Sequence, residues 1–388
     1  MTNSTQNRVA LVDGALGHTG SYLVNLLADH GWNVVATDLE PKKRSIIITK
    51  ESIFKIPNER LSIERKHVEF IPADLTLKES LLPLFENRTY EVIFHTASLY
   101  DYFAPFELLE RVNVGGLKNL LEVYYDSSMK APGGPRPLPR FIHWSTCGVY
   151  GQPTVEYGKH WEKPADETAP YNPPNDYSKS KMLQELLLKQ WRQEKNIPVV
   201  FIRPGPIYGP YQIYGMYHIY HLVRTVGSVP VVCLYPRWRR LRMPMVHVED
   251  LVRAAEFLAE APGDKVLGEA FNVLDECGLQ EDYMENIARL LGADYSYISV
   301  PWIVYDLLAR ITFRAAIRRN RRMRAKGMRP RYDAPMADYI THQYWFSNKK
   351  IKSIGFTFKY PDMVSGTKET VEWYLDHGWL QKEKWEEN

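Results

Sequence analysis

Residues 8–20, Arg-Val-Ala-Leu-Val-Asp-Gly-Ala-Leu-Gly-His-Thr-Gly, decide the fold of this chain. The run from Arg8 to Val12 predicts a buried strand, glycines follow it, and Ser21–Asp29 has the pattern of a helix. Trp32–Thr37 predicts a second strand. A strand, a helix and a strand in this order indicate two parallel strands joined by a crossover helix.

Three glycines in this stretch have the spacing of a dinucleotide-binding turn. Glycine is favoured where a backbone turns tightly and approaches a pyrophosphate, and the N-terminus of the following helix supplies N–H donors to the phosphates. Glycines alone are weak support, because structural turns also use them. Asp38, however, ends the second strand 18 residues after Gly20, where a carboxylate can accept hydrogen bonds from the adenosine ribose. The sequence therefore predicts a dinucleotide site lined by Gly14, Leu16, Gly17, His18, Thr19, Gly20 and Asp38.

Asp38 also bears on the choice of cofactor. A carboxylate there repels the 2′-phosphate of NADP and suits the free hydroxyl of NAD, so NAD is the predicted cofactor. Lys42, Lys43 and Arg44 leave NADP as an alternative, because a flexible cation can reach a phosphate group. We interpret these three residues as a solvated charge run.

The alternation of strands and helices continues beyond Asp38. Short β-rich runs are predicted at Val68–Ile71, Glu91–Ala97, Arg140–Ser145, Val199–Ile202 and Ala270–Leu274, and helices at Leu108–Tyr125 and Tyr177–Gln193. The pattern predicts the α/β class: a Rossmann, doubly wound parallel sheet with a smaller, mostly helical C-terminal substrate domain. We predict that residues 1–204 and 247–275 form the NAD-binding domain, and that 205–246 and 276–388 form the substrate-binding domain.

A candidate catalytic set lies in the middle of the chain. A spacing of four places Tyr177 and Lys181 on one helical face, where the ammonium group can favour the tyrosinate and hold a cofactor ribose. Thr146 follows a predicted strand, and its hydroxyl can orient a substrate oxygen toward Tyr177. A tyrosine and a lysine on a surface helix would have the same spacing. Together with the glycine turn, however, the three residues indicate a base, its activator and an orienting group.

Five further motifs occur in the order in which one enzyme superfamily carries them. They are Ala73-Asp74-Leu75, Phe94-His95-Thr96-Ala97-Ser98, Asn113-Val114-Gly115-Gly116, Arg203-Pro204-Gly205-Pro206-Ile207-Tyr208-Gly209-Pro210 and Val246-His247-Val248-Glu249-Asp250. Over nearly its whole length the chain resembles an extended short-chain dehydrogenase/reductase, the superfamily of the NAD-dependent epimerases and dehydratases and of the 3β-hydroxysteroid dehydrogenases. The resemblance implies a homodimer, and it implies NAD contacts from Asp74, Leu75, Thr96, Ala97, Ser98, Asn113, Tyr177, Lys181, Pro204 and Ile207.

Two departures from the superfamily pattern bear on the substrate. Nucleotide-sugar members usually have Asn where this chain has Pro206. They also have a Gly-Asp-Gly turn followed by Arg-Asp where residues 234–245 here read Leu-Tyr-Pro-Arg-Trp-Arg-Arg-Leu-Arg-Met-Pro-Met. The arginines of this segment remain able to hold a diphosphate. The candidate substrate contacts are Tyr100, Cys147, Tyr208 and Arg242.

The charge of the chain is unevenly distributed. Its 388 residues include 49 basic and 46 acidic side chains, a balance that argues against a nucleic-acid binder. Ten Lys and Arg and no acid lie between Arg310 and Arg331, which leaves 39 basic and 46 acidic groups elsewhere. The apolar run Pro301–Ile317 comes just before most of these cations, which suits peripheral contact of 301–331 with an anionic membrane surface. A phosphate site and an ordinary helix with a solvated basic end are the alternatives.

No pattern in the sequence indicates a metal site or a membrane span. Cys147, Cys233 and Cys277 form no paired motif and are odd in number, and the histidines lack the spacing of metal ligands. The first seven residues are polar and do not fit a signal peptide. We therefore expect a reducing, cytoplasmic location, with membrane-surface association as a further expectation.

The sequence predicts an NAD-dependent oxidoreductase that interconverts a secondary alcohol and a ketone on a bulky apolar, sterol- or terpenoid-like molecule. The C-terminal stretch, whose layout resembles that of hydroxysteroid-dehydrogenase-like members, favours this substrate class. Two alternatives stay open. One is a nucleotide-sugar epimerase or dehydratase with tightly bound NAD, and the other is a non-catalytic dinucleotide-sensing protein, since the fold can serve binding alone.

Overall fold

The computed structural model describes residues 8–39, 65–102, 104–151, 163–213, 215–326, 328 and 342–380. The chain divides into two compact units. The first unit is Met1–Val149, Pro173–Arg203 and Leu251–Phe271, and the second is Tyr150–Asn172, Pro204–Asp250 and Asn272–Asn388. The predicted boundaries differ chiefly at 150–172, which groups with the second unit. The binding role that we assign to each unit stays a prediction.

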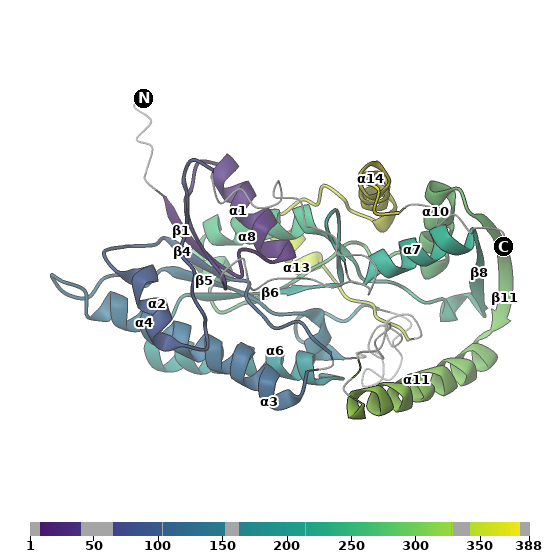
Figure 1. The fold of residues 1–388 in the computed structure, drawn as a ribbon, viewed down its shortest axis with the longest axis horizontal. Coiled ribbons are helices and arrows are strands. Elements are labelled where there is room, and N and C mark those ends of the chain that lie inside the picture. The colour runs from purple at the N-terminus through teal and green to yellow at the C-terminus, as the bar shows by residue number, and fades with distance from the viewer. Residues whose placement is uncertain are drawn as a thin grey trace. The chain divides into compact units, whose positions relative to one another are not determined.

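A seven-stranded sheet forms the centre of the first unit (Figure 1). Its strands are β1 (Val9–Asp13), β2 (Asn33–Thr37), β3 (Val68–Phe70), β4 (Val92–His95), β5 (Arg140–Trp144), β6 (Val199–Pro204) and β10 (Ala270–Val273), in the order β10-β6-β5-β4-β1-β2-β3. Leu11 of β1 pairs with Val35 on one side and Ile93 on the other, both in parallel register. The predicted doubly wound parallel sheet is confirmed, and the order reverses at β1, between β2 and β4.

Helices cover both faces of this sheet (Figure 1). On one face lie α1 (His18–Asp29) and α8 (Val248–Glu260); on the other lie α2 (Lys78–Phe85), α4 (Gly116–Met129) and α6 (Asp176–Lys195). The short helix α3 (Phe106–Leu109) and a π-helical segment, η3 (Glu110–Gly115), lead into α4, and α9 (Gly263–Val266) follows α8. Leu120, Leu121 and Leu188 pack against Ile93 and Phe141 of the sheet in a buried core. Burial of these side chains supplies the main driving force for this layer.

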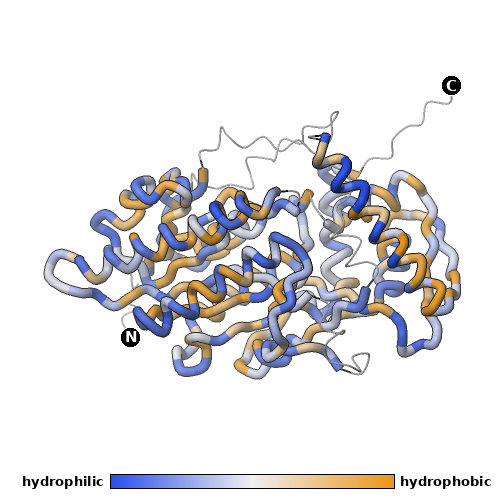
Figure 2. Tube along the Cα trace, turned by 90° about the horizontal axis from the view of Figure 1, so that it is seen from below, coloured by the Kyte–Doolittle hydropathy of each residue, from blue (hydrophilic) through white to orange (hydrophobic). Residues whose placement is uncertain are grey.

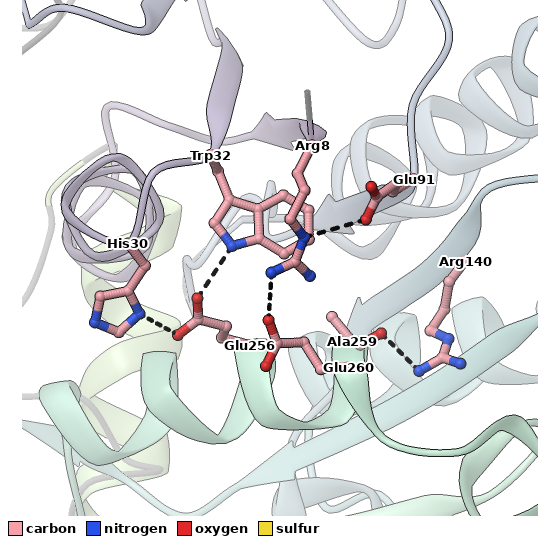
Figure 3. A network of polar contacts seen from close by, with 8 residues as sticks. All are labelled: Arg8, His30, Trp32, Glu91, Arg140, Glu256, Ala259 and Glu260. Carbon is pink, nitrogen blue, oxygen red and sulfur yellow. Dashed lines mark hydrogen bonds and ion pairs between the residues drawn. The ribbon is translucent and has the colours of Figure 1, made fainter. Parts of the chain in front are cut away.

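The amino edge of the sheet holds α8 through a polar network (Figure 3). Trp32 Nε1 donates to Glu256 Oε1 at 3.1 Å, and Arg8 stacks 3.6 Å above the Trp32 ring while pairing with Glu260. Arg140 Nη1 donates to three carbonyl oxygens at the end of α8, those of residues 258, 259 and 261, at 2.6–2.9 Å. A cation therefore satisfies the carbonyl groups that a helix C-terminus leaves without partners.

The second unit contains two pairs of strands and several helices. Strand β7 (Ile207–Tyr208) pairs with β9 (Val246–His247), and β8 (Ser228–Tyr235) pairs in parallel with β11 (Asp294–Pro301). The helices are α7 (Met216–Val226), η5 (Arg237–Arg239), α10 (Gln280–Leu291), α11 (Trp302–Ala325), α13 (Lys349–Ser353) and α14 (Met363–Asp376). The Tyr220 and Tyr283 hydroxyls, 2.7 Å apart, join α7 to α10. Among the described residues no helix is long and apolar enough to cross a bilayer.

Candidate active site

The glycine turn connects β1 to α1 and requires the absence of side chains. Gly14 has a φ of +61°, and a Cβ there would lie 2.8 Å from the Ala97 Cα. A Cβ on Gly20 would lie 2.2 Å from the Gly14 carbonyl oxygen, so α1 can approach the turn only because this residue is glycine. Gly17 is the N-cap of α1. Having no side chain, it leaves the first N–H groups of the helix to a ligand phosphate.

Asp38 lies at the carboxyl end of β2, beside this turn. Its Oδ2 accepts a hydrogen bond from the Leu16 N–H at 3.0 Å, and its Oδ1 accepts one from the Leu39 N–H at 2.8 Å. A carboxylate at this position can accept hydrogen bonds from ribose hydroxyls. The predicted position of Asp38 next to the turn therefore fits an adenosine ribose. Lys42, Lys43 and Arg44 lie outside the described residues.

Asp13 is a buried acid that the sequence analysis did not single out. It ends β1, and its carboxylate bridges to the end of β4: Oδ2 lies 2.5 Å from His95 Nδ1, and Oδ1 accepts from the Ala97 N–H at 2.7 Å. The Thr96 hydroxyl donates to the Asp13 carbonyl oxygen. These contacts hold together the two strand ends where the sheet order reverses. An acid placed directly before the glycine turn is the signal that could have identified it.

Helix α6 carries Tyr177 and Lys181 one turn apart. The Lys181 ammonium is buried and donates to the Trp144 carbonyl oxygen of β5 at 2.8 Å. Burial lowers the pKa of Lys181 to about 7, against the opposing attraction of Asp13 and Glu185. Burial also raises the pKa of the Tyr177 phenol, with a contribution from Tyr100, and the Ser98 hydroxyl lowers it. The phenol therefore needs help from a neighbouring cation to act as a base.

Hydroxyl groups of two other strand ends belong to the same unit as α6. Thr146 Oγ1, just after β5, accepts from the Gly148 N–H at 3.0 Å. A Cβ on Gly148 would lie 2.6 Å from Ser178 Oγ, so this loop lies directly against the start of α6. Ser98 Oγ, after β4, is buried beside the Tyr177 phenol and lowers its pKa through a hydrogen bond. This hydroxyl therefore lies next to the proposed proton acceptor, where it can also contact a ligand oxygen.

Two tyrosines surround the ring of Tyr177. The Tyr100 ring lies edge-on to it with centroids 5.0 Å apart, and the Tyr102 ring does so at 5.6 Å. Tyr100 is 45% exposed. Tyr100 was predicted as a substrate contact, whereas Tyr102 was not; the repeated tyrosine in Tyr-Asp-Tyr after β4 is the available signal. The Tyr177 phenol is thus bordered by two aromatic side chains.

Buried polar groups fix α6 against the sheet. The Arg203 guanidinium of β6 makes two hydrogen bonds to the Glu185 carboxylate, at 2.9 and 2.6 Å, and Ser145 Oγ donates to Glu185 Oε1 at 2.5 Å. Asn113, in the π-helical segment, donates to Ser180 Oγ at 2.9 Å and accepts from the Leu99 N–H at 2.7 Å. Its amide is therefore engaged with the chain itself, and it positions the loop after β4 relative to α6.

Other predicted cofactor contacts of the first unit lie in turns. Asp74 Oδ1 accepts from the N–H and the hydroxyl of Thr76, at 2.9 and 2.7 Å, and the Leu75 carbonyl accepts from Asn119. His18 and Thr19 form the first turn of α1, where the His18 ring lies edge-on to Tyr22.

Three of the predicted substrate contacts are engaged inside their own units. The Cys147 thiol is buried and donates to the Arg203 carbonyl oxygen at 3.1 Å. In the second unit, Tyr208 is buried in β7 beside His247. Arg242 donates to the Cys277 carbonyl oxygen at 3.1 Å and stacks 4.4 Å above Trp345. Pro204 and Ile207 also belong to the second unit, at the end of β6 and in β7.

Comparisons with known proteins agree with this geometry. A family model described as "NAD dependent epimerase/dehydratase family" matches residues 10–273. The dTDP-D-glucose 4,6-dehydratase of Homo sapiens is 23% identical over 382 residues, which cover 96% of this chain and 92% of that protein. The decarboxylating sterol-4-alpha-carboxylate 3-dehydrogenase of Candida albicans is 26% identical over 216 residues, 54% of this chain and 53% of that protein.

Solved structures share the fold. The UDP-glucose 4-epimerase of Thermus thermophilus, in complex with NAD, superposes with a TM-score of 0.64 at 20% identity, covering 95% of this chain and 99% of the other. The dTDP-glucose 4,6-dehydratase of Bacillus anthracis, also in complex with NAD, gives a TM-score of 0.65 at 19% identity, covering 95% of this chain and 97% of the other.

Proposed function

Because the chain belongs to the NAD dependent epimerase/dehydratase family, we propose that it is an NAD-dependent oxidoreductase that interconverts a secondary alcohol and a ketone. The observation that carries this proposal is the position of Tyr177 one helical turn from the buried Lys181 on α6, in the same unit as the glycine turn and Asp38. When bound, NAD supplies the hydride acceptor. Everything else in the reaction is proton transfer and positioning, which are tasks for the chain's own residues.

The residues of the first unit fit NAD. The turn at Gly14–Gly20 admits a pyrophosphate to the N-terminus of α1, and Asp38 can accept from the adenosine ribose. Lys181 would hold the second ribose. Ser98 Oγ, beside the Tyr177 phenol, would contact the bound substrate or cofactor.

Tyr177 would act as the proton acceptor for the substrate hydroxyl. Its phenol has a raised pKa because it is buried, so the positive charge of Lys181 has to stabilise the tyrosinate. Thr146 at the end of β5 would donate to or accept from the substrate oxygen and aim it at the phenol. In the reverse direction, Tyr177 would return the proton to the ketone oxygen.

A bulky apolar substrate suits the aromatic surroundings of Tyr177. Tyr100 and Tyr102 present ring faces and edges there, and aromatic side chains favour apolar ring systems over charged groups. Arg242, the arginine proposed to contact substrate, has its guanidinium occupied by a carbonyl oxygen and by Trp345. A relative named as a sterol dehydrogenase supports the same substrate class.

A nucleotide-sugar epimerase or dehydratase is the second candidate, favoured by the similarity to dTDP-D-glucose 4,6-dehydratase along almost all of both chains. Water elimination needs a proton donor for the leaving hydroxyl. The segment Ser145-Thr146-Cys147-Gly148-Val149 contains no acid. Epimerisation needs no such donor. Within this second candidate we therefore favour an epimerase over a dehydratase.

The substitution Tyr177→Phe tests the catalytic assignment. We expect turnover to fall by about 10²-fold or more, because the proton acceptor is lost, while NAD affinity stays close to that of the native chain. Tyr125→Phe is the matched control, since the partly buried Tyr125 of α4 packs against Trp191 of α6 and not against Tyr177 or the glycine turn in any contact described above. Turnover would be followed by NADH absorbance, and NAD affinity by calorimetry. Substantial activity in Tyr177→Phe would contradict the assignment.

A substrate screen separates the candidates. Sterols, terpenoid alcohols and sugar nucleotides would be incubated with the native protein and NAD, with NADH followed by absorbance and products by mass analysis. Net NADH with an apolar alcohol supports the first proposal. Turnover of a sugar nucleotide without net NADH, by a protein that purifies with NAD, supports the second. NAD binding with no turnover of any class favours a dinucleotide sensor.

We also propose that the protein forms a homodimer, as the family resemblance implies. Sedimentation equilibrium of the full chain measures this directly: a mass of twice 45.2 kDa is expected, and a monomer at all concentrations would contradict the proposal.

A further inference from the structure

The second unit exposes an unusual number of large apolar side chains on one helix. In the first half of α11, Ile303 is 80% exposed, Leu307 58% and Leu308 56%. Val304 and Ile311 are exposed as well. Single exposed apolar residues are common on soluble proteins, but a contiguous set marks a surface that binds something.

The outer face of α11 changes character along its length. Residues 303, 307, 314, 318 and 321 follow one another at helical spacings of three, four or seven, so they lie on the same side of the helix. Leu307 is apolar at this face, whereas Arg314, Arg318 and Arg321 are exposed cations. The opposite side, which includes the buried Ala309, faces the protein. Figure 2 shows the same change from hydrophobic to hydrophilic along this helix.

Aromatic and basic side chains lie next to the start of α11. Strand β11 leads directly into the helix, and its last residue, Pro301, pairs with Tyr235 of β8. Tyr235 is 50% exposed and Trp238 is 59% exposed. The Arg239 guanidinium lies 4.3 Å above the Trp238 ring and 5.5 Å from the Trp302 ring, which joins the two segments. Exposed tryptophan, tyrosine and arginine side by side are typical of residues at the boundary between lipid and water.

We propose that the second unit docks on the surface of an anionic lipid bilayer through the outer face of α11 and the adjoining corner formed by Tyr235, Trp238 and Arg239. The apolar half of the helix enters the boundary between headgroups and acyl chains, and the arginines at 314–322 contact anionic headgroups. No helix of the described residues can span a bilayer, so the contact lies in the plane of the membrane.

The charges favour a lipid surface over other occupants. The one acid of α11, Asp306, is already paired with Arg310 at 2.8 Å. A second copy of the chain would bring the same cations to the contact without an acidic complement. A nucleic acid would satisfy the arginines but leave Ile303 and Leu307 in water. Only an anionic surface above an apolar layer satisfies both halves of the helix.

Vesicle sedimentation of the full chain tests the proposal, with neither substrate nor NAD present, so that its outcome is independent of the catalytic assignment. The probes are phosphatidylcholine vesicles with and without phosphatidylserine. We expect binding to the mixed vesicles that weakens as salt is raised. Changing Arg318, Arg319, Arg321 and Arg322 together to Gln, which retains helix propensity, should lower the bound fraction by about tenfold or more.

The matched control changes Lys66, Lys118, Lys195 and Lys368, exposed lysines of other elements, to Gln, which removes the same charge without touching α11. It should bind like the native chain. A second variant, Ile303→Ser with Leu307→Ser, should also lose binding while keeping the circular dichroism spectrum of the native protein. No binding by the native chain, or equal binding by the arginine variant, would overturn the proposal. Conversion of a native dimer to a monomer by the serine variant, without vesicle binding by either, would assign the face to a second copy instead.

Discussion

Lys181 is the residue at which the function that we propose and the stability of the fold conflict most directly. A charged ammonium in a site that is 2% exposed loses its hydration, and the single hydrogen bond to the Trp144 carbonyl replaces only part of it. Its pKa falls from 10.5 to about 7 for this reason. The same lysine lies one helical turn from Tyr177, where we propose that its charge stabilises a tyrosinate. A residue placed for function is therefore expected to destabilise the fold.

This conflict predicts the pH dependence of the variant Lys181→Met. Between about pH 7 and 10.5 the unfolded chain binds more protons at residue 181 than the folded chain does, so this lysine makes stability rise with pH across that window. Methionine does not titrate, and the variant should lack this rise, which is on the order of a few kcal/mol. We also expect the turnover of Lys181→Met to be lower than that of the native chain, as for Tyr177→Phe. Urea denaturation at a series of pH values measures the difference between variant and native chain.

Lys179→Met is the control, since Lys179 lies on the same helix with its ammonium exposed above the Phe106 ring. It should keep the native pH profile and most of the activity. If the stability of Lys181→Met changes with pH in parallel with that of the native chain, Lys181 is not the group that makes stability rise between about pH 7 and 10.5.

At the scale of elements, the buried pair of Glu185 and Arg203 holds α6 to β6. Both side chains are at most 3% exposed, and Ser145 adds a third hydrogen bond from β5. Removing one member leaves a buried charge without its partner. This lowers the free energy of unfolding by far more than the intact pair contributes to it. The position of Tyr177 and Lys181 relative to Thr146 depends on this contact.

A double-mutant cycle tests this dependence. Arg203→Met should destabilise the protein by about 3–5 kcal/mol, and Glu185→Met by a similar amount, because each leaves one buried charge. The double variant should be less destabilised than the sum of the two, with a coupling of about 1 kcal/mol or more. Denaturant unfolding gives the free energies. Additive effects would show that the two side chains do not act as a pair.

At the scale of the whole molecule, the dinucleotide is expected to stabilise the folded chain by mass action. NAD at about 100 times its dissociation constant adds about 2.7 kcal/mol, provided that it binds only the folded state. NADP should stabilise less, because Asp38 is held at the carboxyl end of β2 by the N–H groups of Leu16 and Leu39 and would face the 2′-phosphate. Asp38→Asn should reduce the difference between the stabilisation by NAD and that by NADP. Thermal unfolding with each dinucleotide measures the two shifts of Tm. If NADP raises the Tm of the native chain as much as NAD does, the predicted preference for NAD is wrong.

The order of strands and helices and the class of the sheet could be predicted from the amino-acid sequence alone. The seven predicted strands of the first unit agree with β1 to β6 and β10 within a few residues, since each is a short buried run with turn residues at its ends. The glycine turn and the position of Tyr177 and Lys181 on one helical face could also be predicted, because both depend on local geometry. The turn requires a positive φ at Gly14, and residues four apart in a helix share a face.

Which distant side chains meet became clear from the folded chain and not from the sequence pattern. Asp13 with His95, Glu185 with Arg203, and Tyr102 with Tyr177 are pairs whose members lie 18 to 82 residues apart, and no periodicity connects them. Burial likewise distinguishes Cys147 and Tyr208, which pack inside their units, from Tyr100, which remains exposed. Local patterns specify the conformation of a segment, whereas contacts and burial arise from packing segments that the sequence keeps apart.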